Sequence, residues 1–459
     1  MANAVRTTRR TSVDMTNGNI VKLIILFALP ILAGQVFQNL YNSVDAIVVG
    51  RYVGTTALAA VSASSDISQL LVGFFTGLST GCGVLLARYF GAQQYERLHD
   101  AIHTALCFAL ILGLCMAAIG IIATPLLLRM VGCPDDVYAE AASYLRIYLA
   151  GILFTAIYNV GSGILRAVGD SRHPFYYLVI SSIVNIVLDL VFVVFLDMGV
   201  MGVALATIIS QLTSVSLVFR QLTHTEDVYK VTFSHLKLDR ELVREVIDLG
   251  LPSAIQSSLI SISNLFVQRY INGFGSAAMA GIGAAKKIDK FVGLIAQSVG
   301  QSATTFISQN YGARKLDRAF KSLLYCMAIN FTMIALIGTP IYFLAEKAVS
   351  IFTPDPDSIV YGVGMIQVMM PCYFIQSLNA LFANATRGFG KSKVVMCCSI
   401  FGMVICRQIF LAVTMHFNYD VINVYRGYPF GWACAAVSVM TYFYFAIWRK
   451  HKGELKKAQ

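Results

Sequence analysis

Long apolar runs separated by short polar breaks fill most of the 459-residue chain. Each run holds roughly 20 or more residues, the length that an α-helix needs to cross a hydrocarbon core about 30 Å thick. The pattern predicts an all-α integral membrane protein with twelve transmembrane helices. The predicted spans are 22–48, 57–87, 101–128, 139–163, 175–196, 200–219, 246–271, 277–308, 320–344, 359–386, 394–416 and 429–448.

The second half of the chain repeats the first at a nearly constant offset. Leu29-Pro30 returns as Leu251-Pro252. Eight further pairs of identical residues share one constant offset, which is one residue shorter than the offset between these two Leu-Pro pairs. Because each half holds six helices, an even number, both halves enter the membrane in the same direction. The repeat predicts two six-helix lobes related by an axis along the membrane normal, with a substrate cavity between two bundles. The eight pairs are Gly54/Gly275, Ala57/Ala278, Ile67/Ile288, Gly91/Gly312, Ala92/Ala313, Arg166/Arg387, Gly169/Gly390 and Ser171/Ser392.

This repeat predicts the organisation of the whole chain. The predicted parts are an N-terminal tail at 1–21, an N-lobe at 22–219, a linker at 220–245, a C-lobe at 246–448 and a C-terminal tail at 449–459. Each lobe can bury its apolar face against the other, so a monomer suffices.

Composition and charge agree with a membrane protein. Hydrophobic residues make up 57% of the chain and charged residues only 13%, against about 25% charged in soluble domains. The net charge of +11 would suggest nucleic acid in a soluble protein, but 25 of the 35 Lys and Arg residues fall in alternate loops and tails or, like Lys22 and Lys321, at the adjoining ends of spans. The positive-inside rule then places both termini and the linker in the cytoplasm. No nucleic-acid partner is expected, and no secretory signal precedes the first span.

Motifs for catalysis, ATP hydrolysis and structural metals are missing from the sequence. Gly390-Lys391-Ser392 approaches a phosphate-binding loop, but Ala385 stands where that loop needs glycine. The ten cysteines have no paired C-x-x-C spacing, and no zinc-protease or serine-hydrolase motif occurs. We therefore expect no enzyme and no cofactor.

Two carboxylates stand out within the predicted spans, where an ionisable group is expensive and marks a functional site. Asp45, Asp189 and, on the next helix, Thr207 all lie in the outer halves of their predicted helices and so share a similar depth. Asn185 shares a helix face with Asp189 because it lies four residues earlier. These four residues could bind Na⁺ or hold a proton. The alternative is that each acid only pairs with a buried base such as Arg146.

A proline and a set of polar and aromatic residues complete the candidates of the first half. Pro30 removes one backbone hydrogen bond within the first span, which predicts either a hinge or a static kink. The Gly73, Gly77, Gly81 series predicts close helix packing. Five other residues either line a cavity, where aromatic faces attract organic cations, or form hydrogen bonds between helices. They are Gln38, Tyr41, Asn42, Tyr158 and Asn159.

The second half does not repeat the two acids. The offset places Cys406 and Arg407 opposite Asn185, and Asp45 maps near Val267. A group of charged residues occurs instead within the span 277–308. These residues either pair locally through their single acid or line a positive pocket that favours anionic or zwitterionic substrates. They are Lys286, Lys287, Asp289 and Lys290.

Three segments of the first half carry a family resemblance. They are Leu29-Pro30 followed by Gln38-Asn39-Leu40-Tyr41-Asn42-Ser43-Val44-Asp45, then Leu165-Arg166-Ala167-Val168-Gly169-Asp170, and Asn185-Ile186-Val187-Leu188-Asp189. With these motifs the sequence resembles, over about its whole length, the multidrug and toxic compound extrusion (MATE) family. The resemblance implies antiport, in which cytotoxic and often cationic, aromatic compounds leave the cell while H⁺ or Na⁺ enters. It also implies a location in the bacterial plasma (inner) membrane.

Carried over to this chain, the resemblance implies a cation site in the N-lobe and a bend of helix 1 at Pro30. The cation site would consist of Asp45, Asn185, Asp189 and Thr207. Some family members also place acids in two C-lobe helices, where this chain has Gln268 or Asn264 and Gln376, so no second ion site is expected.

We therefore expect secondary active multidrug efflux by alternating access of two lobes, with drugs or dyes and the lipid bilayer as partners. The alternative is a flippase for a lipid-linked or phosphorylated precursor. A receptor or channel is a third class, which would bind ligand or conduct ions without counter-transport.

Overall fold

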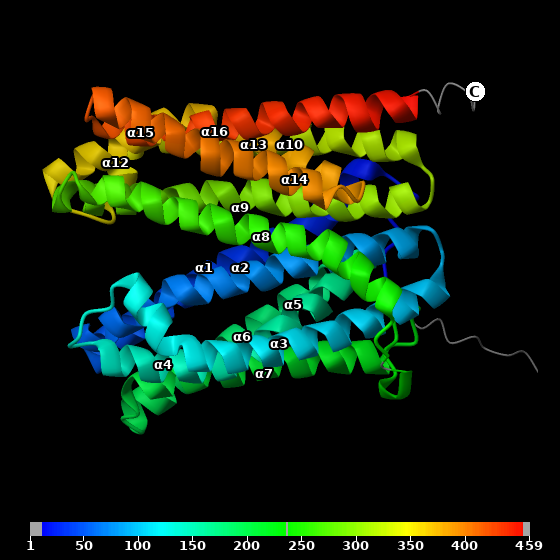
Figure 1. Cartoon of the computed structure of the whole chain (residues 1–459), viewed down its shortest axis with the longest axis horizontal. Coiled ribbons are helices and arrows are strands. Elements are labelled where there is room, and N and C mark those ends of the chain that lie inside the picture. The colour runs from blue at the N-terminus through cyan, green and yellow to red at the C-terminus, as the bar shows by residue number, and fades with distance from the viewer. Residues whose placement is uncertain (1–11, 236, 453–459) are drawn as a thin grey trace, which may run out of the picture. The chain divides into compact units, whose positions relative to one another are not determined.

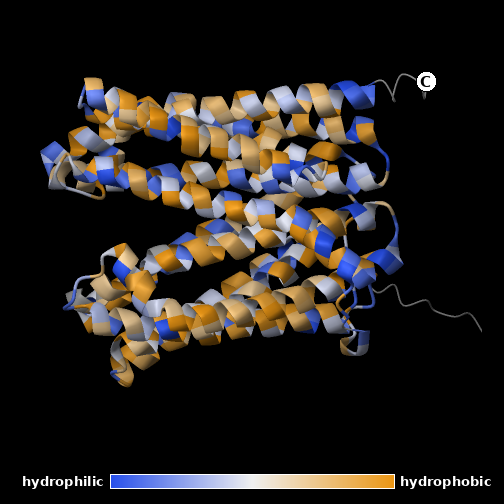
Figure 2. Ribbon diagram, in the orientation of Figure 1, coloured by the Kyte–Doolittle hydropathy of each residue, from blue (hydrophilic) through white to orange (hydrophobic). Residues whose placement is uncertain are grey.

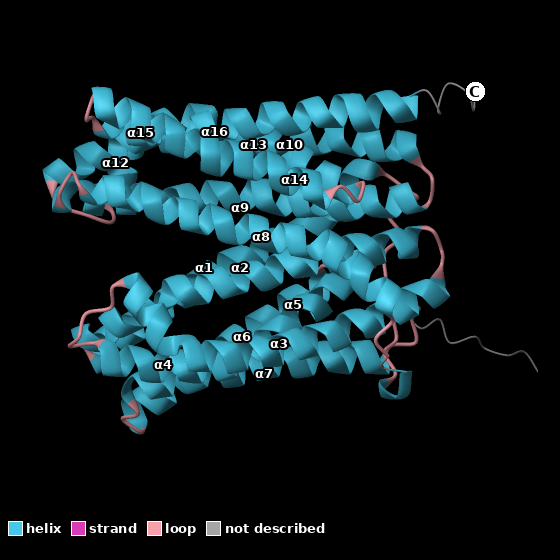
Figure 3. Ribbon diagram, in the orientation of Figure 1, coloured by secondary structure: helices cyan, strands magenta, loops and turns pink. Residues whose placement is uncertain are grey.

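The computed structural model describes residues 12–235 and 237–452, and over these residues it consists of helices joined by short loops (Figures 1 and 3). The all-α fold is confirmed. Hydrophobic residues follow the helices, and hydrophilic ones gather in the loops and at helix ends (Figure 2). The predicted tails at 1–21 and 449–459 fall partly outside the described residues.

Nearly all of the predicted spans meet the length and hydropathy expected of a membrane helix. In the described chain, ten helices qualify, and the bent pair of helices within 138–167 makes an eleventh. The remaining predicted span, 277–308, lies in a 37-residue helix, Ser276–Gly312, that is not among them. That helix carries four charged residues, Lys286, Lys287, Asp289 and Lys290, and several Ser, Thr and Gln residues, all of which lower its hydropathy.

The described residues form two compact units of similar size. Unit 1 contains Ala33–Gly250 and the described residues before Gly18. Unit 2 contains Gly18–Leu32 and the described residues from Leu251 onward. Helices α1 (Ile20–Val48) and α8 (Arg240–Asn272) each contribute to both units.

Unit 1 is built on helix α2, which packs against α3, α4 and α5, while α6 packs against α7. The largest apolar cluster described in the unit includes Phe75, Leu85 and Ile164, and a smaller one includes Leu128 and Leu145. The helices of unit 1, besides its parts of α1 and α8, are α2 (Thr55–Gly91), α3 (Tyr95–Val131), α4 (Tyr138–Ala150), α5 (Ile152–Ala167), α6 (Arg172–Asp189) and α7 (Gly199–His224), with the π-helical turns η1 (Val49–Val53) and η2 (Leu190–Phe195) and the 3-10 turn η3 (Phe233–His235).

Unit 2 is built on helix α9, which packs against α10, α12 and α13, while α13 packs against α16. Its apolar cluster includes Val267, Val292 and Leu411. The helices of unit 2, besides its parts of α1 and α8, are α9 (Ser276–Gly312), α10 (Leu316–Phe343), α11 (Ala345–Ser350), α12 (Pro356–Met369), α13 (Tyr373–Gly388), α14 (Ser392–Ser399), α15 (Arg407–Phe417) and α16 (Val421–Tyr442), with the turns η4 (Met370–Cys372), η5 (Ile400–Cys406) and η6 (Phe443–Trp448).

The backbone reproduces the repeat that the sequence predicts. Helices α2 and α9 begin and end at equivalent positions of the two halves, and so do α5 and α13. Three positions with positive φ recur at the same offset, namely Gly54/Gly275, Gln93/Arg314 and Gly169/Gly390. Left-handed backbone is rare outside glycine, so its return at matched positions shows that both halves turn their loops in the same way.

The two helices that contribute to both units change unit at equivalent places. Helix α1 passes from unit 2 to unit 1 after Leu32, and α8 passes from unit 1 to unit 2 after Gly250. Pro30 and Pro252, which are partners in the repeat, each lie within two residues of these positions. A close approach explains the grouping of early α8 with unit 1, because a Cβ on Gly81 of α2 would lie 2.2 Å from the Cα of Gly250.

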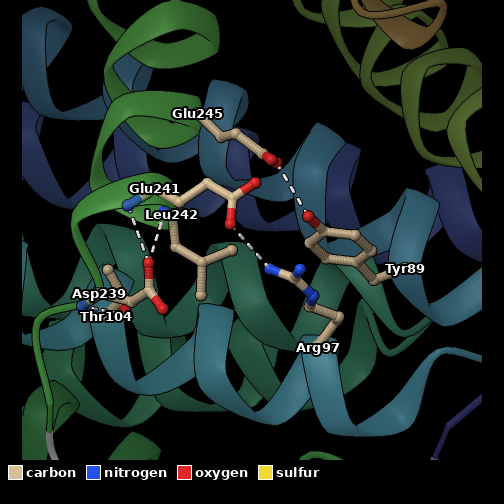
Figure 4. A network of polar contacts seen from close by, with 7 residues as sticks. All are labelled: Tyr89, Arg97, Thr104, Asp239, Glu241, Leu242 and Glu245. Carbon is tan, nitrogen blue, oxygen red and sulfur yellow. Dashed lines mark hydrogen bonds and ion pairs between the residues drawn. The ribbon is translucent and has the colours of Figure 1, made fainter.

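Polar contacts also hold the first turns of α8 within unit 1 (Figure 4). The Tyr89 hydroxyl donates to Glu245 at 2.9 Å, and Arg97 pairs with Glu241 at 3.3 Å. The Asp239 carboxylate accepts from the first free backbone N–H groups of the helix, including that of Glu241 at 2.8 Å. Helix α8 therefore begins at Arg240, within the linker predicted at 220–245.

Candidate cation-coupling site

Both acids of the predicted site lie beside a π-helical turn. Asp45 is near the end of α1, four residues before η1, and Asp189 is the last residue of α6, directly before η2. The two turns pack against each other within unit 1. A π turn interrupts the regular hydrogen-bond ladder and is frequent at functional sites. The paired turns bring the ends of two helices, and with them the two acids, together.

The carboxyl groups of Asp45 and Asp189 lie within hydrogen-bonding distance of each other. Asp189 is only 1% exposed. Oδ1 of Asp45 and both carboxyl oxygens of Asp189 are buried and have no hydrogen-bond donor among the described residues. Two carboxylates cannot donate to each other, so their contact becomes a hydrogen bond only when one carries a proton. A proton or a metal cation between the oxygens would therefore satisfy the pair.

Helix α4 contributes a buried tyrosine near the acids, which the sequence interpretation missed together with the tyrosine one turn later. Tyr144 and Tyr148 of α4 are buried, and their rings stack with centroids 6.2 Å apart. Tyr144 lies within electrostatic range of Asp45 and Asp189. Their spacing of four residues places both on one helix face, and this is the signal that would have found them.

The structure places the other two predicted ligands differently. Asn185 is 3% exposed, and its Nδ2 has no partner among the described residues. It lies one turn before Asp189 on α6 and so adds a polar group to the same face. The Thr207 hydroxyl instead donates to the Val203 carbonyl of its own helix at 3.0 Å. No described contact joins Thr207 to either acid, so its part in the site stays a prediction.

The alternative in which each acid pairs with a base receives no support. Arg146 is exposed, and the ion pairs found among the described residues involve neither Asp45 nor Asp189. The acids therefore lie together without a basic partner in the described part of unit 1.

The five candidate cavity residues divide into two groups. Gln38 and Asn42 are exposed, and Tyr41 hydrogen-bonds to Gln38. The other two take part in contacts between helices: Tyr158 donates to the Pro174 carbonyl at 3.2 Å, and Asn159 accepts from Thr76 at 3.3 Å. The contacts of Tyr158 and Asn159 favour the packing interpretation for these two, while cavity lining stays a prediction for all five. Pro30 lies inside a continuous α1, and its predicted role as a hinge also stays a prediction.

Unit 2 has a different set of polar contacts at the equivalent positions. Val267, which maps near Asp45, is fully buried in the apolar cluster. Gln268 accepts from Lys286 at 2.7 Å, and the Asp289 carboxylate accepts from the Tyr373 hydroxyl. The ion pairs found among the described residues do not include Asp289. The lysines of this group therefore form no ion pair with Asp289 among the described residues.

Comparison with known proteins decides the family. The MatE family model matches the chain twice, over residues 30–191 and 252–413. The chain belongs to the MatE family. The two matches start at Pro30 and Pro252, which are partners in the internal repeat, so the family model follows that repeat.

Curated relatives of this MatE protein carry the names of multidrug resistance and multidrug export proteins. It is 28% identical over 435 residues to the probable multidrug resistance protein YoeA of Bacillus subtilis, with 93% of each chain covered. It is 20% identical to the multidrug export protein MepA of Staphylococcus saprophyticus, covering 84% of this chain and 85% of the relative.

Solved structures share the fold. A multidrug resistance MATE family transporter of the MOP superfamily in an outward-facing conformation superposes with a TM-score of 0.89 at 24% identity, covering 98% of this chain and 99% of that one. A MOP superfamily transporter from Pyrococcus furiosus, described as having a binding pocket of reversed polarity, gives a TM-score of 0.88 at 24% identity, with coverage of 94% and 97%. These values confirm the expected transporter fold.

Proposed function

We propose that this MatE protein is a secondary active exporter that moves organic compounds, often cationic and aromatic, out of the cell in exchange for H⁺ or Na⁺. One observation carries the proposal. Asp45 and Asp189 touch inside unit 1, and three of their oxygens are buried without a donor among the described residues. An acid pair of this kind binds a small cation and responds to its concentration. The names of the relatives support drugs as the exported compounds.

Exchange requires that cation and exported compound disfavour each other's binding. Two like charges confined between helices repel strongly, and a cation that enters between them removes that repulsion. Cation binding thus changes the free energy of the site, and the linkage is reciprocal, so a bound compound must weaken cation binding by the same factor. Alternating access of the two six-helix halves would then couple cation entry to export.

The remaining parts of the proposal follow from the family and the charge pattern. The protein would lie in the bacterial plasma membrane with both termini in the cytoplasm. It would work as a monomer and need no cofactor beyond the coupling ion.

The test is ethidium efflux from reconstituted vesicles, with a proton gradient and a sodium gradient imposed separately. Wild-type protein should export ethidium under at least one gradient, and Asp45→Asn should abolish gradient-driven export while inserting and folding normally. Full export by Asp45→Asn at equal protein amount would refute the proposal.

A flippase for a lipid-linked or phosphorylated precursor is the second candidate. It is favoured by the basic side chains of unit 2, where Lys286 and Arg407 lie near each other. A flippase should leave ethidium tolerance and ethidium efflux unchanged and should instead move a fluorescent phosphate-bearing lipid between leaflets.

A further inference from the structure

Two basic side chains lie near each other inside unit 2. Lys286 lies within α9, and Arg407 is the first residue of α15, directly after the π turn η5 and well inside the span Ser392–Phe417. Lys286 lies ten residues after the start of α9 at Ser276, and Arg407 lies ten residues before the end of α15 at Phe417. Lys286 is therefore about 15 Å from the helix end at Ser276, and Arg407 is about 15 Å from the helix end at Phe417. The loops at these helix ends lie side by side, because the rings of Phe274 and Tyr419 stack at 4.7 Å. Lys286 and Arg407 thus share a depth measured from one face of the unit.

These two residues form a basic cluster with repulsion inside it. Lys286 interacts electrostatically with Arg407, which is unfavourable, and with Asp289, which is favourable. Arg407 is only 2% exposed and lies over the ring of Tyr428, 5.5 Å from its centroid. Two positive charges against one negative charge leave the cluster with a net positive charge.

Neutral groups satisfy only part of the hydrogen-bonding capacity of the cluster. Lys286 donates to Gln268 at 2.7 Å, and Arg407 donates through Nη2 to Ser263 at 2.6 Å. Nε of Arg407 is buried and has no acceptor among the described residues. Asp289 does not form an ion pair with Lys286, since its carboxylate accepts from Tyr373. A positive charge inside a membrane protein is expensive unless an anion compensates it.

We propose that Lys286 and Arg407 form an anion site in unit 2, which takes the carboxylate or phosphate of an organic compound. A guanidinium presents a planar fork that matches either group, and a lysine adds a point charge. The inference rests on the proposed export function only in assigning such compounds to the transported class, which would then include zwitterions and organic anions.

Matched probes test the site directly. Dansylglycine carries a carboxylate, and its methyl ester has the same aromatic body without the charge. Binding of both is measured by fluorescence titration of the full chain in phosphatidylcholine nanodiscs. A charge-assisted contact predicts that the acid binds about ten-fold or more tightly than the ester. Phenyl phosphate should compete with the acid.

Three variants separate an anion site from a loss of folding. Arg407→Gln and Lys286→Gln should each reduce the preference for acid over ester. Asp289→Asn should increase that preference, because it removes the only acid of the cluster. Opposite changes from variants in one cluster are not expected from misfolding. Lys287→Gln is the control and should change nothing, since Lys287 is exposed and lies over the ring of Phe352.

Changing the lipid composition of the nanodisc distinguishes a lipid headgroup from a dissolved compound as the source of the anion. If phosphatidylglycerol in the nanodisc weakens dansylglycine binding in wild type but not in Arg407→Gln, the site is confirmed with a lipid headgroup as a ligand. If it has no effect while the acid preference holds, the site is confirmed for solutes. Equal binding of acid and ester in wild type, or a preference unchanged in both Arg407→Gln and Lys286→Gln, would overturn the proposal.

The ethidium assay keeps this inference apart from the proposed function, because ethidium carries no anionic group. Gradient-driven ethidium export by a protein that does not distinguish acid from ester would reject the anion site alone. A protein that prefers the acid yet exports no ethidium would reject the export function alone.

Discussion

Replacing Asp189 by Asn is the most informative perturbation of the candidate coupling site. Asp189 is 1% exposed, touches the carboxyl of Asp45 and has no donor for either oxygen among the described residues. Asn preserves the size of the side chain and removes its charge. The variant therefore changes the electrostatics of the acid pair with little change in packing.

The size of the effect follows from the geometry. A cation between two touching carboxylates lies roughly 4 Å or less from each, and at an effective dielectric constant near 20 each attraction is about 4 kcal/mol. Removing one carboxylate should thus weaken cation binding by about three powers of ten. The same loss is expected for Asp45→Asn. In transport, the double variant should be hardly worse than either single variant, because loss of one acid already removes coupled exchange.

The assay measures the cation concentration that gives half-maximal ethidium exchange in reconstituted vesicles. Sodium is titrated at fixed pH, and pH is titrated without sodium, for wild type and for each variant. We expect the half-maximal concentration of the coupling ion to rise about a thousand-fold in Asp189→Asn, or transport to vanish within the accessible range. The other ion should have no effect on either protein.

Asp197→Asn is the matched control. Asp197 follows the same helix, is exposed, and has a φ of 49°, which asparagine tolerates. The cation concentration that gives half-maximal exchange by Asp197→Asn should equal that of wild type. The reasoning would be refuted by an Asp189→Asn protein that folds and transports with an unchanged cation requirement, because the pair would then have no part in coupling.

Three further predictions concern packing and helix ends. Gly81→Ala should lower the free energy of unfolding by about 1–3 kcal/mol or more, because the new Cβ would meet the backbone of Gly250. The control Gly283→Ala should not lower the melting temperature, because its Cβ meets nothing within 4 Å. Equal melting temperatures of the two variants would contradict this prediction. Asn159→Ala should cost about 1 kcal/mol of stability and leave the ethidium KM unchanged, and the reverse result would make Asn159 a cavity residue. Hydrogen bonds from Ser358 lower the pKa of Asp355 below its usual 3.8. The stabilisation of α12 by this cap is therefore present above that pH and is lost as the pH falls toward the lowered pKa. A melting-temperature difference between wild type and Asp355→Ala that does not shrink on acidification would count against this prediction.

The sequence by itself determined the span pattern, the repeat and the two acids. A hydrocarbon core about 30 Å thick demands apolar runs of about 20 residues, so helices can be read from hydropathy alone. Ionisable residues in such runs are expensive, which is why Asp45 and Asp189 stand out. Even here α9 shows a limit, because it contains the predicted span 277–308 and yet is not among the helices of the described chain that qualify as membrane spans.

Only the tertiary structure decided which side chains touch. Periodicity gives the face of a helix but not its rotation against a neighbour, so it could not tell that Asp189 meets Asp45 while Thr207 bonds to its own helix. Asp289 shows the same limit. It lies three residues from Lys286, which suggested a local ion pair. Its carboxylate instead accepts a hydrogen bond from the Tyr373 hydroxyl of another helix. Hydrogen bonds are short and directional, so they depend on the packing of helices distant in sequence, and that packing leaves Lys286 and Arg407 as a net positive cluster.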